Sequence, residues 1–258
     1  MLKRASDKNR IFFIDELRGF SILCMIFYHA FYLFDSFFAW EWADVLFDFF
    51  MPLQPLFAGI FIFLCGISCT FSRNNLKRGL ILLGIALGFT FVTAVIMPKM
   101  GFEGSEIYFG ILHFLAVSIL IYALFFKLFA KVSPIFGIIS CAVLYPFTSS
   151  VADGVFSYGD LVSFKIPELF YESDLLMPLG FYSESFFSAD YFPLLPNIFI
   201  FLSGVFAGFV FERTGYPEWA KKKRIPFFGF LGRYTLPIYV VHMPVIYAMG
   251  FIITLFIN

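Results

Sequence analysis

Residues 10–35 read RIFFIDELRGFSILCMIFYHAFYLFD, and this stretch indicates a membrane-spanning helix. Residues 17–34 are apolar apart from Arg18 and His29, and they are numerous enough to cross the hydrocarbon core of a bilayer. An ionisable side chain in hydrocarbon is costly unless it is paired or hydrated. Asp15 and Arg18 at the start of the helix and an imidazole near its far end therefore suggest chemistry conducted through a membrane.

The composition indicates an all-α, polytopic membrane protein. Of the 258 residues, 60% are hydrophobic, and the mean hydropathy is +0.87, which is too apolar for a soluble domain of this size. About seven transmembrane helices are expected. The seven apolar segments are Leu17–Phe34, Pro55–Phe71, Gly79–Met97, Ile107–Phe129, Pro134–Phe147, Leu194–Phe211 and Tyr234–Ile257.

Charges in the connecting segments alternate in sign along the chain. The basic segments contain Lys3, Arg4, Lys8 and Arg10, then Arg73, Lys77 and Arg78, then Lys127 and Lys131, then Arg213, Lys221–Arg224 and Arg233. The segments between them are predominantly acidic, with Glu103 and Asp160 among their carboxylates. Because basic loops stay cytoplasmic, we predict a cytoplasmic N-terminus (1–16) and an external C-terminus. We expect residues 1–258 to form one transmembrane domain in the plasma membrane.

Two segments outside the apolar runs are predicted on the outer side. Residues 35–54 mix Phe and Trp with acids, which is typical of an amphipathic helix lying on a membrane surface. Residues 148–193 form a long loop, and loops of that length are usually functional or disordered. The many aromatic residues in this loop favour an ordered lid.

Small residues and cysteines bear on packing. The pairs Gly84–Gly88 and Gly204–Gly208 have the spacing that lets helix backbones approach, and they permit a homodimer. The four cysteines all fall in apolar segments, with no His or acid at metal-ligand spacing. We therefore expect neither disulfides nor a metal site.

Three ionisable groups are predicted near the outer ends of helices. With about 1.5 Å of rise per residue, His29 lies about 9 Å inside the outer end of its helix, and His113 lies at a similar depth. Asp190 lies at the outer mouth of the sixth helix. An imidazole beside a carboxylate is the usual arrangement for a general base, so these groups are candidates for catalysis in one external pocket. The alternative is two separate structural histidines, each hydrogen-bonded to a neighbour.

Two further positions have more than one interpretation. His242 lies about two turns into the last helix, between Pro237 and Pro244, where prolines free backbone carbonyls that a structural histidine can bind. A functional role for His242 remains equally open. Asp15 can cap the first helix or pair with Arg18 three residues later, whereas a guanidinium at the inner interface is also a good anion ligand.

The basic side chains on the cytoplasmic side have three interpretations. They act as topology signals, contact lipid headgroups, or bind a phosphorylated ligand. The candidates for ligand binding outside the first helix are Arg73, Lys77, Arg78, Lys221–Arg224 and Arg233.

Five stretches resemble one family. They are IDELRGFSILCMIFYHAFY (14–32), LFAGIFIFLCGIS (56–68), YFGILHFLAVSIL (108–120), DYFPLLPNIFIFLSGVFAG (190–208) and LGRYTLPIYVVHMPV (231–245). Together they resemble the heparan-α-glucosaminide N-acetyltransferase catalytic-domain family of membrane acyltransferases. The first stretch is also similar to the acyltransferase-3 family, but FGILH and DYFPLLP favour the first assignment.

The resemblance implies acetyl transfer from cytoplasmic acetyl-CoA to an amine or hydroxyl of an external glycan or glycolipid. The predicted donor-binding residues are Asp15, Arg18, Arg73, Lys77, Arg78, Arg233 and His242, and the predicted catalytic residues are His29, His113 and Asp190. The catalytic histidine of the family has no counterpart between Ala30 and Leu112, so the role of His29 rests on its own position. Membrane lipids are expected partners, and nucleic acid is not.

Two rival functions remain open. In a proton-coupled transporter or flippase, His29 and His113 would relay protons and the aromatic loop would act as a gate. A third interpretation is a non-catalytic membrane partner, in which alanine at Arg18 or His29 would cost no activity.

Overall fold

The computed structural model describes residues 10–101, 104–159 and 161–257. Within these residues, seven helices are long and apolar enough to span a membrane, which confirms the all-α class and the predicted number of spans. The spans are Phe12–Ser36, Glu41–Phe71, Asn75–Lys99, Ile111–Phe129, Pro134–Asp153, Leu194–Thr214 and Thr235–Phe256. The sides of the two termini stay predictions. The predictions that involve Lys3, Arg4, Lys8, Glu103 and Asp160 lie outside the described residues.

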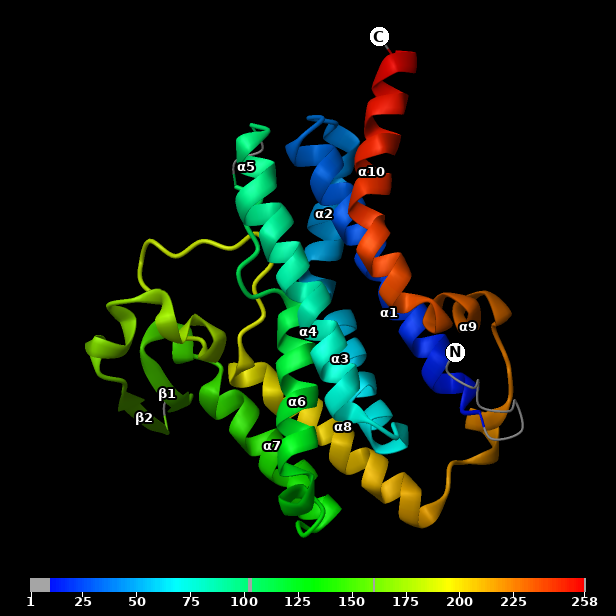
Figure 1. Ribbon diagram of the computed structural model, residues 1–258, viewed down its shortest axis with the longest axis vertical. Coiled ribbons are helices and arrows are strands. Elements are labelled where there is room, and N and C mark those ends of the chain that lie inside the picture. The colour runs from blue at the N-terminus through cyan, green and yellow to red at the C-terminus, as the bar shows by residue number, and fades with distance from the viewer. Residues whose placement is uncertain (1–9, 102–103, 160, 258) are drawn as a thin grey trace. The chain divides into compact units, whose positions relative to one another are not determined.

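The helices and strands are labelled in Figure 1. They divide between two compact units. The first unit comprises Met1–Leu64 and Thr214–Asn258, and the second comprises Cys65–Arg213. Helix α3 (Gln54–Phe71) contributes residues to both units. The single domain expected over residues 1–258 stays a prediction.

Besides its part of α3, the described portion of the first unit contains two long helices and two shorter ones. They are α1 (Phe12–Ser36), α2 (Glu41–Phe50), α9 (Pro226–Arg233) and α10 (Thr235–Ile257). The predicted amphipathic segment at 35–54 includes α2, which continues through the 3₁₀ turn Met51–Leu53 into α3 with helical backbone at both junctions. The location of α2 at an outer membrane surface stays a prediction.

Glycines bring the backbones of α1 and α9 into direct contact. A methyl group on Gly19 would overlap the carbonyl oxygen of Phe228 in α9. In the reverse direction, a methyl group on Gly232 would overlap the carbonyl oxygen of Asp15 in α1. Small residues permit this approach because a helix without Cβ atoms at the crossing has no side chain to separate the two backbones.

A buried carboxylate joins α1 to the chain that enters α9. The Glu16 side chain is 6% exposed, and its Oε1 accepts hydrogen bonds from the backbone N–H groups of Arg224 (2.7 Å) and Ile225 (2.9 Å). Ile225 is the N-cap residue of α9, where backbone N–H groups lack helical partners and the helix dipole favours a negative charge. Glu16 therefore fixes the start of α9 against α1.

The second unit contains five helices and one hairpin. The helices are α4 (Asn75–Phe91), α5 (Met97–Lys99), α6 (Ile111–Phe129), α7 (Pro134–Thr148) and α8 (Leu194–Thr214). A π turn at Val92–Ile96 joins α4 to α5 and completes one span.

The predicted small-residue contacts hold for one glycine pair and not the other. In α8, Gly204 is buried, and a methyl group on Gly208 would lie 2.6 Å from the Thr70 side chain. In α4, a methyl group on Gly84 or Gly88 would meet no described atom within 4 Å. The close packing predicted for Gly84 and Gly88 is therefore wrong within the described chain. The helix contact of α4 instead involves Gly79, which lies against Leu120 of α6.

The fourth span begins four residues later than the hydropathy pattern predicts. The apolar run starts at Ile107, but α6 starts at Ile111 because the Asp190 Oδ2 atom accepts a 3.1 Å hydrogen bond from the Ile111 N–H group. Just before the helix, Phe109 pairs with Tyr191 in a parallel bridge. Residues near the end of the long loop therefore determine where this helix begins.

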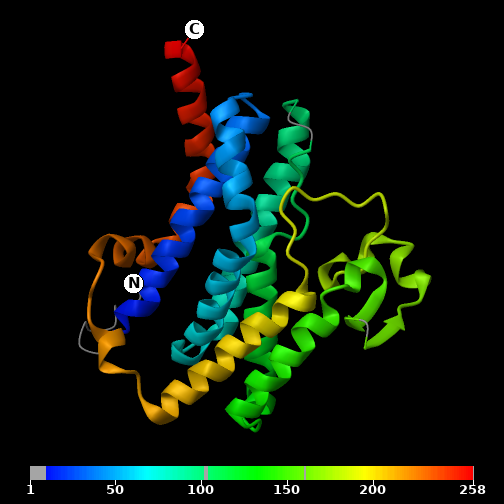
Figure 2. The ribbon, with the colours of Figure 1, turned by 180° about the vertical axis from the view of Figure 1, so that it is seen from behind.

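The long loop at 148–193 is folded. Strands β1 (Val155–Tyr158) and β2 (Val162–Lys165) form an antiparallel hairpin that lies at one end of α7 (Figure 2). Three 3₁₀ turns, Val151–Asp153, Glu168–Tyr171 and Asp174–Leu179, complete the loop. Burial raises the pKa of the Tyr191 hydroxyl, which donates a 2.7 Å hydrogen bond to the Met177 carbonyl. The role of the loop as a lid stays a prediction.

Candidate functional site

Two imidazoles lie together in the first unit. His29 in α1 and His242 in α10 have ring centroids 5.2 Å apart, with planes inclined at 51°. The Tyr28 ring lies 5.3 Å from the His29 ring, and the Tyr239 ring lies 5.2 Å from the His242 ring. His242 is buried at 6% exposure, whereas His29 is only partly buried. The structure therefore pairs a predicted catalytic residue with one that the sequence grouped with the donor site.

The hydrogen bond of His242 fixes which ring nitrogen carries its proton. Nδ1 lies 2.5 Å from the carbonyl oxygen of Tyr239. A carbonyl only accepts, so Nδ1 carries the proton, and Nε2 of the neutral ring is an acceptor. Within the described residues, this buried Nε2 has no hydrogen-bond partner. Pro244 has no N–H group, so it leaves the carbonyl of residue 240 without a helical hydrogen bond. His242 binds the carbonyl of Tyr239 instead, and therefore does not use the carbonyl that Pro244 frees.

His113 lies in the second unit and has a different environment. Its ring is 5% exposed, its Nε2 lies 3.0 Å from the Thr90 hydroxyl of α4, and its ring centroid is 5.7 Å from that of Phe109. A hydroxyl can serve a histidine nitrogen as either donor or acceptor. This contact agrees with the structural interpretation of His113, and its catalytic role stays a prediction.

Asp190 lies at the N-terminus of the helix that carries His113. In addition to the bond that Oδ2 accepts from Ile111, its backbone carbonyl accepts a 2.7 Å hydrogen bond from the Ser188 hydroxyl. A methyl group on Gly110 would overlap Oδ2, so the carboxylate fits closely against the start of α6. One oxygen of Asp190 is therefore engaged as a helix cap, and a catalytic role for the residue stays a prediction.

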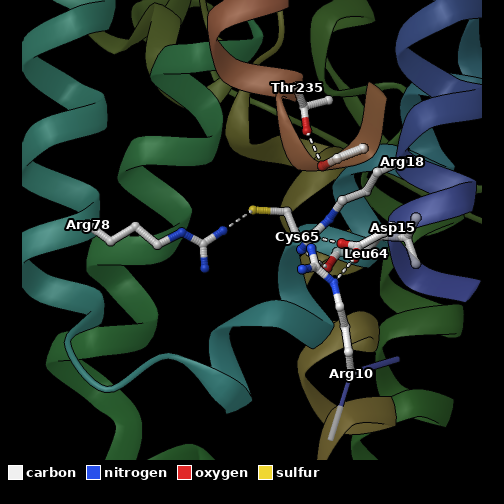
Figure 3. Close-up of polar contacts among 8 residues, drawn as sticks. Arg10, Asp15, Arg18, Leu64, Cys65, Arg78 and Thr235 are labelled. Atoms are coloured by element: carbon white, nitrogen blue, oxygen red, sulfur yellow. Dashed lines mark hydrogen bonds and ion pairs between the residues drawn. The ribbon is translucent and has the colours of Figure 1, made fainter. Parts of the chain in front are cut away.

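The charged residues at the start of α1 form a small network (Figure 3). Asp15 is buried, and its carboxylate lies 2.6 Å from Arg10 Nε and 3.8 Å from Arg18 Nη1. Arg18 also donates from Nη2 to the Leu64 carbonyl at 3.5 Å. The predicted pairing of Asp15 with Arg18 is present. The N-cap of α1 is Ile11, with no side-chain cap, so the capping role considered for Asp15 is wrong.

Arg233 lies near the same end of α1, because the residue before it contacts that helix. Its neighbour Gly232 lies against the Asp15 carbonyl, and Thr235 Oγ1 donates to the Gly232 carbonyl at 2.8 Å. The Arg233 side chain is exposed. Two predicted donor-binding cations, Arg18 and Arg233, therefore flank one helix crossing in the first unit.

The predicted donor-binding cations of the second unit lie near the start of α4. Arg78 Nη2 lies 3.4 Å from Cys65 Sγ (Figure 3). Arg78 Nη1 lies 3.9 Å from a second thiol, Cys69 Sγ. Arg73 and Lys77 are exposed, and the Lys77 N–H group is capped by the Asn74 side chain at 2.8 Å. The role of these three cations in donor binding stays a prediction.

Three of the four cysteines are buried: Cys65, Cys69 and Cys141. In the described part of the chain, no group of three or more His, Cys, Asp or Glu is placed to hold a metal ion.

The sequence did not reveal three of these contacts. The pairing of His29 with His242 depends on how α1 packs against α10, and no local pattern encodes that. The anchoring role of Glu16 had one local signal, a second acid beside Asp15 in the first turns of a membrane span. The i,i+4 spacing of Cys65 and Cys69, followed by Arg78 after a short turn, was a signal for a shared contact.

The comparisons with known proteins gave one match. The family model described as Heparan-alpha-glucosaminide N-acetyltransferase, catalytic, matches residues 10–244. No curated protein and no solved structure matches the chain. The matched residues include the charged end of α1, both imidazoles of the first unit, and His113 and Asp190.

Proposed function

The chain belongs to the heparan-alpha-glucosaminide N-acetyltransferase catalytic family, and from this premise we propose that it transfers an acetyl group from acetyl-CoA to a glycan across the membrane. Family membership implies acetyltransferase activity, and the seven spans make the chain a multi-pass membrane protein. The finer proposal is that the donor enters from the cytoplasm of a cell whose plasma membrane holds the protein. The acceptor is an amine or hydroxyl of an external glycan or glycolipid.

The layout of α1 is the observation that carries this proposal. At its start Arg10 and Arg18 lie beside Asp15, Glu16 is engaged by two backbone N–H groups, and Arg233 adds an exposed cation. His29 follows Arg18 by eleven positions, which corresponds to about 16 Å along a helix. A phosphate-binding end and an imidazole on one membrane helix suit a donor with a phosphorylated head and a long, narrow arm that ends in the reactive thioester.

The proposed reaction needs one base and no metal. The phosphates of acetyl-CoA bind at Arg18 and Arg233, because guanidinium groups match phosphate geometry. His29 removes the proton from the acceptor N–H or O–H group while the acceptor atom bonds to the thioester carbonyl carbon. The carbon–sulfur bond then breaks, and the proton passes from His29 to the leaving thiolate. The products are the acetylated glycan and free coenzyme A.

The test is acetyl transfer by purified protein in proteoliposomes. Radiolabelled acetyl-CoA is supplied on one side, and an amino sugar or a neutral hexose is supplied on the other. We expect His29→Ala to lower turnover about 100-fold, since general base catalysis contributes at least that much. Phe27→Leu is the matched control, because Phe27 is exposed on α1 two residues away. Equal turnover in His29→Ala and wild type would remove His29 from the mechanism.

The same experiment discriminates against the rival functions. Proton-coupled uptake of sugar without any consumption of acetyl-CoA would overturn the proposal in favour of a transporter. The comparison of an amino sugar with a neutral hexose shows whether nitrogen or oxygen is the accepting atom.

A further inference from the structure

The Nε2 atom of His242 is a buried acceptor without a partner among the described residues. A buried polar atom left without a hydrogen bond destabilises the folded protein, and native proteins retain few of them. The Nδ1–H group is already engaged with the Tyr239 carbonyl, so the ring cannot turn over without breaking that bond. The lone pair on Nε2 is therefore held in a fixed direction, where a hydrogen-bond donor would satisfy it.

His29 is the neighbouring ring that can supply this donor. The two ring centroids are 5.2 Å apart. Each imidazole nitrogen lies about 1 Å from its centroid, so nitrogens that face one another along that line would be about 3 Å apart, which is a hydrogen-bond length. The His29 ring is only partly buried and can rotate about its own side-chain bond, whereas His242 is buried and tethered.

We propose that His242 is a positioning residue for His29, accepting an N–H···N hydrogen bond on Nε2 so that the other nitrogen of His29 faces the acceptor. This inference rests on the proposed function and deepens it. His242 then belongs to the site of transfer and not to the donor-binding residues. In each turnover one proton moves from the acceptor atom to His29 and then to the leaving thiolate, and the hydrogen bond to His242 stabilises His29 while it carries that proton.

Two amide substitutions separate this role from a structural one. In His242→Gln, the amide reaches the former place of Nε2 and retains an acceptor for His29. In His242→Asn, the shorter amide retains an N–H donor for the Tyr239 carbonyl but leaves nothing at Nε2. A positioning role predicts that Gln stays within about tenfold of wild-type kcat and that Asn loses about 100-fold. The KM for acetyl-CoA stays unchanged in both variants, because His242 does not contact the donor.

The outcomes distinguish the inference from the proposed function. If wild type transfers no acetyl group, the proposed function fails. If wild type is active and His29→Ala is not, but Asn at position 242 retains activity and Gln loses it, His242 serves only the Tyr239 carbonyl and the inference is overturned. Equal activity of both variants also overturns it, as does an increase in the KM for acetyl-CoA with unchanged kcat.

A measurement on the wild type decides the point without activity and without any variant that must fold. The chain has three histidines, so ¹⁵N-labelled imidazole signals in lipid bilayers are few and assignable. We expect His242 to carry its proton on Nδ1 and a nitrogen–nitrogen coupling across the hydrogen bond between the His29 and His242 rings. A proton found on Nε2 of His242, or the absence of that coupling, contradicts the inference.

Discussion

Removing the Glu16 carboxylate should release the start of α9 from α1. A single carboxylate oxygen of Glu16 accepts hydrogen bonds from the backbone nitrogens of Arg224 (2.7 Å) and Ile225 (2.9 Å). Hydrogen bonds to a charged group contribute about 2 kcal/mol each, so Glu16→Ala should cost local stability of about 4 kcal/mol. Glu16→Gln keeps an acceptor oxygen in the same place, and bonds to a neutral group of about 1 kcal/mol each leave a loss of about 2 kcal/mol.

Amide hydrogen exchange of the intact protein in detergent or lipid measures this loss at the two residues concerned. Exchange reports the free energy of local opening, and about 1.4 kcal/mol corresponds to a factor of ten. The expected increases at Arg224 and Ile225 are therefore roughly 30-fold in Glu16→Gln and up to about 1000-fold in Glu16→Ala. The exposed ion pair between Glu218 and Lys221 lies on the same segment, so Glu218→Ala is the matched control with no expected change.

This prediction also has a functional consequence, because α9 carries Gly232 and Arg233. A loosened α9 should raise the KM for acetyl-CoA in Glu16→Ala while kcat changes less, since the imidazoles lie elsewhere on α1 and α10. Unchanged exchange at Arg224 and Ile225 in Glu16→Ala would refute the anchoring role, whatever the activity.

Substitutions at two further positions, Gly19 and Asp190, test the packing and the cap. Gly19→Ala should abolish folding of the first unit, because the added methyl group overlaps the Phe228 carbonyl. The control Gly84→Ala adds a methyl group that meets no described atom, so the yield of monodisperse protein in detergent should stay unchanged. Equal yields of the two variants would contradict the close crossing of α1 and α9. Asp190→Ala should destabilise the start of α6 by about 1 kcal/mol, as loss of a helix cap does. Asp190→Asn retains an acceptor and should restore both thermal stability and acetyl transfer if Asp190 is only a cap, whereas restored stability without activity would support its predicted catalytic role.

The number of spans was predictable because it depends only on the length and apolarity of each segment. A run of about twenty apolar residues has no alternative in a bilayer, since its backbone groups must satisfy one another. The start of α6 was not predictable in the same way. Hydropathy placed it at Ile107, but Asp190, which follows 79 residues after Ile111, caps the helix at Ile111. A contact between residues so far apart in the sequence leaves no local pattern.

In the candidate site, too, contacts within one helix were predictable and contacts between helices were not. The pair Asp15–Arg18 has i,i+3 spacing within one helix, so the sequence alone predicts it, and the structure contains it at 3.8 Å. His242 was grouped with the donor residues from its position in its own helix, which does not show which helix lies beside it. Its ring contacts His29 only because α1 and α10 pack side by side at Leu33, Phe34 and Ile246.

If His29 is the base, as proposed, a histidine partner has a physical advantage at membrane depth. A carboxylate would hold the base equally well, but a charge placed among apolar helices carries a large desolvation cost in the resting enzyme. A neutral imidazole accepts the same kind of hydrogen bond without that cost. His242 gains its direction from a backbone carbonyl, which is also uncharged. In the proposed mechanism, the chain from Tyr239 through His242 to His29 therefore carries no charge until His29 takes a proton from the acceptor. Charge then exists at this depth only during the reaction itself, when the leaving thiolate is present to take the proton.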